Sequence, residues 1–217
     1  MGLIDDPNGV YKIVLLRHGE SEGNVKGYFQ GHADFELTET GAAQSQALAE
    51  RWCSEGVTFD RIFSSPLARA RQTAEIIAES LGVLIEFDPD LMEWDNGLLS
   101  GLTHEEAEER FPRPDFIRPY DPIGRTGESR WELYLRAGRA LQNLLNGPPG
   151  RYLIVSHGGI LNMLLYAILG IVPQANFQGS RFRFLNTSFA SLEYDPGRHN
   201  WLLERLNDRA HWTGRDK

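Results

Sequence analysis

The chain has 217 residues, of which 41% are hydrophobic and 24% are charged, and its formal net charge is −8. This length and composition are typical of one globular domain with a sizeable core and exclude a largely disordered chain. The acidic balance also disfavours sequence-independent binding of nucleic acid, which requires a broad basic face. A small anionic substrate would therefore need a local cationic pocket.

Cysteine usage and hydropathy limit the cellular context. Cys53 is the only cysteine, so the chain can form neither an internal disulfide nor a cluster of thiolate metal ligands. The segment 1–9 has no basic start and no long apolar run, so we expect no signal peptide. The longest apolar run, 160–172, is too short to cross a membrane. We predict a cytoplasmic protein without a membrane partner.

The first half of the chain alternates short apolar runs with amphipathic stretches. We expect strands at 11–16, 59–63 and 83–87 and helices at 39–54 and 67–81. Thr38 is a suitable N-cap for the first helix, and Ser65-Pro66 is a start signal for the second. Gly82 marks the end of that second helix.

The second half resumes this alternation after an irregular stretch. Between Glu93 and Tyr134 the periodicity weakens, and we predict that residues 94–135 form an inserted lid within a single domain spanning 1–217. We then expect a helix at 131–145, a strand at 151–156, a helix from about 160, and strands at 182–185, 189–194 and 200–206. The alternation predicts an α/β fold with three layers, α/β/α, around a mostly parallel sheet.

Two of the predicted strands end in a histidine beside a glycine. Arg17-His18-Gly19 follows the first strand, and His157-Gly158 follows the strand at 151–156. Ligands of open α/β sheets bind at the carboxyl ends of the strands, so this coincidence indicates a site there. Either pair alone would more often be an ordinary loop.

Arginine is the residue type best suited to a phosphoryl group, because its planar fork binds two oxygens. Arg17 adjoins His18, and Arg69 lies in the first turns of the helix after a neighbouring strand. Arg71 competes with Arg69 but lies about 200° around the helix from it, so both cannot face one pocket. Arg69 shares a face with Thr73, which favours Arg69. A neutral His18 imidazole could attack phosphorus if its other nitrogen donates to a backbone carbonyl.

These residues carry a family resemblance. The chain resembles histidine phosphatases of the phosphoglycerate-mutase-like superfamily from Lys12 to about Tyr194. The motifs, in order and at the family's spacing, are Leu16-Arg17-His18-Gly19-Glu20-Ser21, Gly31-x-x-Asp34-x-x-Leu37-Thr38-x-x-Gly41, Ser64-Ser65-Pro66-Leu67-x-Arg69-Ala70-x-x-Thr73-Ala74, Leu91-x-Glu93-x-x-x-Gly97, Gly127-Glu128-Ser129 and Val155-Ser156-His157-Gly158.

The resemblance implies a role for each matching position. His18 would become phosphohistidine, while Arg17, Arg69 and His157 would hold the phosphoryl oxygens with help from the backbone near Gly158. Glu93 would protonate the leaving oxygen and then activate water. The remaining matches line the phosphate or substrate entrance and comprise Ser21, Asn24, Gln30 and Gly31. No metal or other cofactor is implied, and the expected partner is a small phosphorylated substrate. A homodimer is the default oligomer.

Departures from the mutase pattern favour phosphatase action. Mutases of this family carry Glu-Arg-His-Tyr at the acid and a lysine for the substrate carboxylate. This chain has Glu93-Trp94-Asp95-Asn96, and His104 stands where that lysine would be. Phe29-Gln30-Gly31 and Gly127-Glu128-Ser129 resemble the broad-specificity phosphatase branch. The alternatives are a cofactor-dependent phosphoglycerate mutase and a phosphoprotein-binding module.

Two further sets of residues leave their roles open. The insertion holds the arginines 110, 113, 118, 125 and 130, which either bind a second anionic group of the substrate or pair with nearby acidic residues. His32 either touches substrate or is an exposed loop residue. His199 and His211 are expected to be solvated in a polar tail.

Overall fold

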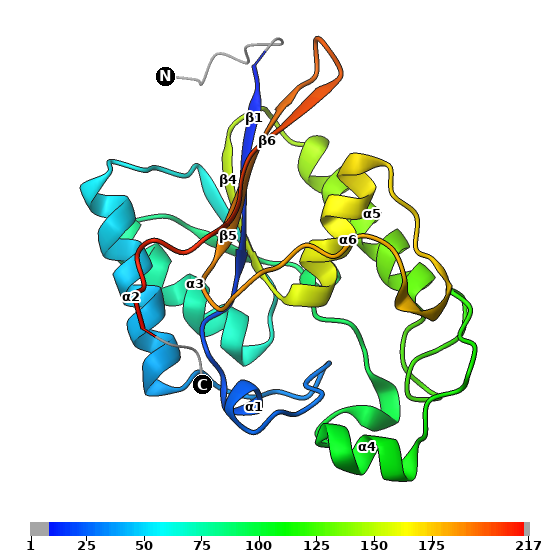
Figure 1. Ribbon diagram of the computed structural model, residues 1–217. Helices are drawn as coiled ribbons and strands as arrows, with labels where there is room; N and C mark the ends of the chain where they lie inside the picture. Colours follow the sequence, from blue (N-terminus) through cyan, green and yellow to red (C-terminus); the bar gives the residue numbers. More distant parts are fainter. Residues whose placement is uncertain (1–8, 215–217) are drawn as a thin grey trace.

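A single six-stranded sheet forms the centre of the molecule (Figure 1). The computed structural model describes residues 9–214 and orders the strands β3-β2-β4-β1-β5-β6. Their bounds are β1 (Tyr11–Arg17), β2 (Arg61–Ser64), β3 (Ile85–Phe87), β4 (Arg151–Ser156), β5 (Phe189–Asp195) and β6 (Asn200–Asp208). The first four strands run parallel, whereas β5 runs antiparallel to β1 and β6 antiparallel to β5. The predicted mostly parallel sheet is confirmed.

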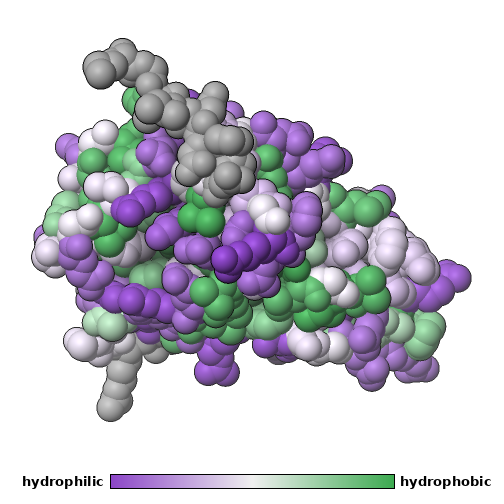
Figure 2. All heavy atoms as spheres, turned by 90° about the horizontal axis from the view of Figure 1, so that it is seen from above, coloured by the Kyte–Doolittle hydropathy of each residue, from purple (hydrophilic) through white to green (hydrophobic). Residues whose placement is uncertain are grey.

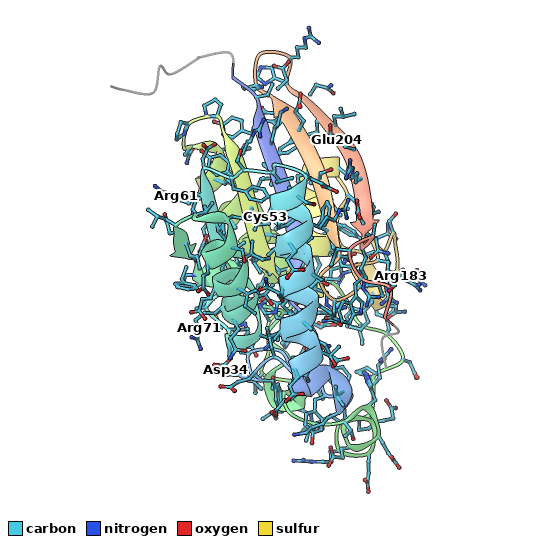
Figure 3. The ribbon with its side chains drawn as sticks, turned by 90° about the vertical axis from the view of Figure 1, so that its left-hand side faces the viewer. Asp34, Cys53, Arg61, Arg71, Arg183 and Glu204 are labelled. Atoms are coloured by element: carbon cyan, nitrogen blue, oxygen red, sulfur yellow. The ribbon has the colours of Figure 1, made fainter. Side chains whose placement is uncertain are left out.

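Helices cover both faces of this sheet. Helices α2 (Glu39–Ser54) and α3 (Ala68–Leu81) lie side by side in front of one face, as Figure 3 shows, and α5 (Arg130–Leu145) and α6 (Gly158–Leu169) cover the other. The alternation of β4 explains the arrangement, because Leu153 and Val155 join the core beneath α2 and α3 whereas Ile154 joins the core beneath α5 and α6. The predicted three-layer α/β fold is therefore confirmed.

The register of β1 and β4 brings the two histidine-containing strand ends together. Arg17 of β1 pairs with Ser156 of β4, and the His18 backbone N–H donates to Ser156 O at 2.9 Å. Because the strands are parallel neighbours, the residues that follow them, His18 and His157, emerge side by side at the carboxyl edge of the sheet.

The predicted strand at 182–185 is wrong. Its backbone groups are bonded by side chains instead of by a strand. Asn162 bonds both Phe182 O at 2.9 Å and Phe182 N at 2.8 Å, and the Arg17 guanidinium donates to Phe184 O at 2.7 Å. These bonds satisfy the backbone in an irregular conformation, so the alternating phenylalanines do not indicate pairing here.

The start of α3 also differs from its predicted form. The N-cap is Leu67, which has no side-chain cap, so neither Ser65 nor Pro66 begins the helix. Asp34, distant in sequence, accepts the Ala68 N–H at 2.6 Å and supplies a carboxylate to the helix N-terminus.

The segment 94–135 is largely irregular and holds the short helices η2 (Gly97–Leu99) and α4 (His104–Arg110). Two further short helices, η1 (Pro89–Leu91) and η3 (Ala175–Phe177), flank the sheet elements. The missed helix α1 (Glu22–Val25) lies beside α4 at the end of the molecule where β1 finishes (Figure 1). Both α1 and α4 begin with capping boxes, on Ser21 and Thr103. That the segment acts as a lid stays a prediction.

The opposite end of the molecule, where β1 begins, presents mixed hydrophilic and hydrophobic residues (Figure 2). Among residues 9–214, no helix has both the length and the apolar character needed to cross a bilayer. The segment for which no signal peptide is expected lies, apart from Gly9, outside the described residues.

Candidate active site

The His18 imidazole is held with one nitrogen engaged and the other open. Its Nδ1 lies 2.6 Å from Gly19 O, so Nδ1 carries the proton and Nε2 keeps its lone pair. Within residues 9–214, Nε2 has no hydrogen-bond partner, and the side chain is only 2% exposed. Burial, followed by the charges of Arg69 and Arg17, lowers the pKa of His18 well below its ordinary value. The ring is therefore a neutral imidazole with one free nucleophilic nitrogen.

The His157 ring lies 5.1 Å from that of His18, centroid to centroid. Arg69 Nε donates to His157 Nδ1 at 3.1 Å, which places the His157 proton on Nε2, 2.8 Å from Ser65 Oγ. Burial, followed by the charge of Arg69, lowers the pKa of His157 well below its ordinary value. His157 is thus also neutral and is fixed in one tautomer.

Arg69 is the buried cation of the site. It is 1% exposed, and its two terminal nitrogens donate to Ala33 O at 3.1 Å and Gly31 O at 2.9 Å. Burial lowers the pKa of Arg69 to about 10, so it remains charged at neutral pH. Arg71, two residues on, instead points to the surface (Figure 3) and pairs with Glu75. The helical spacing predicts this division.

Arg17 reaches the site from the end of β1. Its Nη1 donates to Phe184 O at 2.7 Å, and its charge contributes to the lowered pKa of His18. The side chain lines the cavity described below. Arg17 and Arg69 therefore bring two positive charges to the two histidines.

Glu93 lies at the amino end of α6. Its Oε1 accepts the N–H groups of Trp94 at 2.8 Å and Ile160 at 3.2 Å, and its Oε2 accepts that of Gly159 at 3.1 Å. These three bonds fix the orientation of the carboxylate beside the first turn of α6. A carboxylate is thus held within the electrostatic field of Arg69.

The predicted entrance residues Ser21, Asn24 and Gln30 form one hydrogen-bonded group. Ser21 is fully buried, caps α1, and its hydroxyl lies 2.9 Å from Asn24 Oδ1 and 2.8 Å from Gln30 Oε1. Asn24 and Gln30 line the cavity, whereas Ser21 supports them from beneath.

The two predicted glycines place backbone groups at the site. Gly31 has a left-handed φ of 47°, and a side chain there would collide with Ser100 and Asn96. Its carbonyl accepts from Arg69, as described above. Gly158 is the first residue of α6, so its N–H belongs to the helix N-terminus, and it too lines the cavity.

A cavity of about 1310 Å³ adjoins these groups. Its walls come from the end of β1, the 24–31 loop, the segment 93–133 and the irregular stretch 176–185. Of the arginines in the insertion, Arg113 and Arg130 line it. Arg118 instead pairs with Asp121, so the sequence-based alternative of surface pairing holds for that residue.

Three residues that support the site were not predicted as site residues, although Ser65 lies within one of the family motifs. Ser65 was interpreted as a helix start, yet its hydroxyl binds His157. Asn186 donates to His18 O at 3.0 Å, and Arg136 donates to Glu93 O at 3.0 Å. Asn186 and Arg136 lie 168 and 43 residues from these partners, so their roles follow from the fold alone.

The other histidines take several environments. His32 is exposed, and its Nε2 lies 2.8 Å from Glu93 O. His199 is exposed, as expected. The expectation for His211 is wrong, because its Nε2 lies 3.0 Å from Thr187 Oγ1 and burial lowers its pKa to about 4. The tail contacts Thr187, just before β5, and His211 is not free in solvent.

Comparison with known proteins defines the family. A model of the histidine phosphatase superfamily (branch 1) matches residues 13–209, and the chain belongs to this superfamily. A probable phosphoglycerate mutase GpmB of Photorhabdus laumondii is 39% identical over 211 residues, covering 92% of this chain and 94% of the relative.

Solved structures of other proteins match this chain over more than nine tenths of its length. A mycobacterial glucosyl-3-phosphoglycerate phosphatase in complex with VO3 has a TM-score of 0.75 and 30% identity, covering 91% of this chain and 98% of that chain. A phosphoserine phosphatase of Entamoeba histolytica in complex with 3-phosphoglyceric acid has a TM-score of 0.74 and 25% identity, covering 93% and 98%. The relatives' names thus include both a mutase and phosphatases.

Proposed function

We propose that this protein hydrolyses phosphate monoesters of small metabolites through a phosphohistidine at His18. The observation that carries the proposal is the hydrogen bond from His18 Nδ1 to Gly19 O, which leaves Nε2 unprotonated among two arginines. Membership of the histidine phosphatase superfamily supports the same reading.

The proposed first step transfers the phosphoryl group to the enzyme. The negative charge of the arriving phosphate favours the protonated form of the Glu93 carboxyl group. His18 Nε2 then attacks phosphorus, the bond to the ester oxygen breaks, and Glu93 gives that proton to the departing oxygen. Arg17, Arg69 and His157 offset the charge on the phosphoryl oxygens, with the N–H of Gly158. Ser21, Asn24, Gln30 and Gly31 shape the entrance.

In the proposed second step, water replaces the alcohol. The Glu93 carboxylate takes a proton from water, the oxygen attacks phosphorus, and the N–P bond breaks to give inorganic phosphate and neutral His18. Every group in both steps belongs to the protein or substrate, so the proposal requires no metal.

The departure from the mutase motif at residues 93–96 and at His104 favours hydrolysis over phosphoglycerate isomerisation. Among residues 9–214, no lysine lines the cavity. His104, which replaces the mutase lysine, packs its ring 4.4 Å from that of Phe29 and is not part of the lining. A mutase must retain its intermediate and exclude water. The product formed from 3-phosphoglycerate decides between the two, because hydrolysis gives free phosphate and isomerisation gives 2-phosphoglycerate.

The test of the nucleophile uses p-nitrophenyl phosphate with a chelator present. His18→Ala should abolish turnover, and the matched His199→Asn variant, changed at an exposed hairpin, should keep it. Quenched wild-type enzyme should carry an acid-labile phosphate on His18. Equal turnover by His18→Ala, or phosphate found on another residue, would overturn the proposal and favour a binding module.

Glu93→Gln tests the acid. The variant should slow esters with poor leaving groups far more than p-nitrophenyl phosphate, since only the former need a proton on the departing oxygen. Equal losses on both substrates would count against this role.

A further inference from the structure

The cavity beside His18 concentrates positive charge in a chain that is acidic overall. Of the residues in the range 9–214, five arginines and one carboxylate, that of Glu93, line this cavity, although the net charge of the chain is −8. Two of the five are already engaged. Arg17 belongs to the proposed phosphoryl site, and Arg130 is buried and donates to Gln178 O and the Tyr166 hydroxyl. The other three are Arg113, Arg181 and Arg183.

These three arginines have an unused binding capacity. All are exposed, and none forms an ion pair with any residue in the range 9–214. Arg61 and Arg71, by contrast, pair with glutamates on the opposite edge of the molecule from Arg183 (Figure 3). Guanidinium groups without a carboxylate partner that converge on one cavity favour an anionic ligand.

The wall beside them is built under backbone strain. Asn176 and Phe177 have left-handed φ values of 54° and 55°, which a bulky side chain such as Phe rarely adopts. Two hydrogen bonds maintain this turn, from Ile117 N to Asn176 Oδ1 at 2.7 Å and from Asn176 N to Ile117 O at 2.8 Å. Strain of this kind is found at ligand clamps.

The strained turn places an aromatic ring beside one of these arginines, Arg113. Phe177 packs edge-to-face against Trp94, with ring centroids 5.6 Å apart, and the Arg113 guanidinium lies 5.9 Å from the Phe177 centroid. Trp94 directly follows Glu93, the proposed acid. The aromatic wall therefore lies on the side of the cavity where the leaving group departs.

We propose that Arg113, Arg181 and Arg183, beside the Trp94–Phe177 wall, form a second anion subsite for the leaving group. This inference rests on the proposed hydrolase function and narrows the class of substrates. The substrate class is phosphate monoesters whose alcohol carries a carboxylate or a second phosphate together with a flat or apolar portion. The cavity volume of about 1310 Å³ leaves room for an alcohol larger than a three-carbon acid.

The test compares aryl phosphates that differ in one charge. The probes are 4-carboxyphenyl phosphate, its neutral analogue 4-carbamoylphenyl phosphate, and 1,4-phenylene bisphosphate. The wild type should prefer the carboxylate or the bisphosphate over the neutral ester by about tenfold in kcat/KM, mainly through KM, as expected for a few solvent-screened ion contacts. Which charged ester is preferred distinguishes the carboxylate from the phosphate.

Variants assign that preference to the three arginines. Arg181→Gln combined with Arg183→Gln, and Arg113→Gln separately, should remove most of the preference and leave turnover of the neutral ester within about twofold. Arg118→Gln is the matched control, because it lies in the same insertion but pairs with Asp121. Equal wild-type kcat/KM on charged and neutral esters, or equal losses on both in the variants, would overturn the subsite.

The outcomes separate this inference from the proposed function. Turnover of the neutral ester that depends on His18 would uphold the hydrolase even if the subsite failed. If no ester were hydrolysed, calorimetry with 4-carboxybenzylphosphonate and benzylphosphonate would still decide the subsite. Tighter binding of the carboxylate, lost in the Arg181→Gln/Arg183→Gln variant, supports it, and equal affinity refutes it.

Discussion

Replacing Arg136 by methionine should destabilise the protein far more than the same replacement of Arg139, one turn further along α5. All five N–H groups of Arg136 are used. They donate to both carboxylate oxygens of Glu128 at 2.7 and 2.9 Å and to the carbonyls of Asp90, Met92 and Glu93 at 2.8, 2.7 and 3.0 Å. Arg136 therefore joins α5 to the backbone that carries the proposed acid.

The size of the effect follows from burial. The side chains of Arg136 and Glu128 are 12% and 16% exposed, so removing the cation leaves a largely desolvated carboxylate. The carbonyls of Asp90 and Met92 lose their donor, whereas Glu93 O keeps only His32 Nε2. Breaking such a pair costs about 3 kcal/mol, at the low end of the range for buried pairs because some solvent reaches it. For a domain of this size, that corresponds to a fall in Tm of roughly 6–12 °C.

Arg139 provides the matched control. It makes a two-pronged ion pair with Asp90, both bonds at 2.6 Å, but its side chain is 58% exposed. An exposed pair contributes about 0–1 kcal/mol, so Arg139→Met should lower Tm by no more than about 4 °C. Differential scanning calorimetry of both variants measures the contrast. Equal Tm values for the two variants would refute the argument that burial and the carbonyl contacts make Arg136 important.

Three further predictions concern a cap and two titrations. Asp34→Ala should lower the free energy of unfolding by about 0.5–2 kcal/mol, because Ala68 loses its capping carboxylate; a urea titration that shows no change would contradict this. Burial and the charge of Arg69 lower the pKa of His18, so the imidazole should stay neutral below pH 6.5. The kcat/KM for p-nitrophenyl phosphate, corrected for the ionisation of the substrate, should therefore persist below pH 6.5. A fall in kcat/KM centred at pH 6.5 would count against a neutral buried nucleophile. His211, with its pKa lowered to about 4 by burial, stabilises the fold fully above pH 6.5 and loses this contribution as the pH falls towards 4. Between pH 6.5 and pH 4, the free energy of unfolding should therefore fall less in His211→Gln than in the wild type, by at most about 3 kcal/mol. Identical pH profiles of the unfolding free energy in the two proteins would exclude this linkage.

The layered fold could be predicted because its causes are local. Short β-branched runs alternate with helices of 12 to 16 residues, and this pattern leaves few arrangements other than a parallel sheet covered on both faces. The one false strand, at 182–185, has the alternation of a strand. Its backbone is instead bonded by Asn162, whose reach across 20 residues no periodicity reveals.

The candidate site divides in the same way. His18 and His157 could be predicted as site residues because each directly follows the end of a strand. Arg69 could be predicted because its position on the helix could be compared with that of Arg71. Glu93 lies in an irregular segment, so the family motif alone indicated it. The Ser65 hydroxyl contacts His157 across 92 residues, a contact that requires the β2–β4 pairing to exist first.

The pairing of β1 with β4 has a practical consequence for folding studies. Both strands lie inside the sheet, with two neighbours each, and the separation of His18 and His157 is set by their backbone pairing. Interior strands of this kind open only when the whole domain unfolds. On the proposed function, recovery of p-nitrophenyl phosphate turnover during refolding should therefore report the completion of the central sheet.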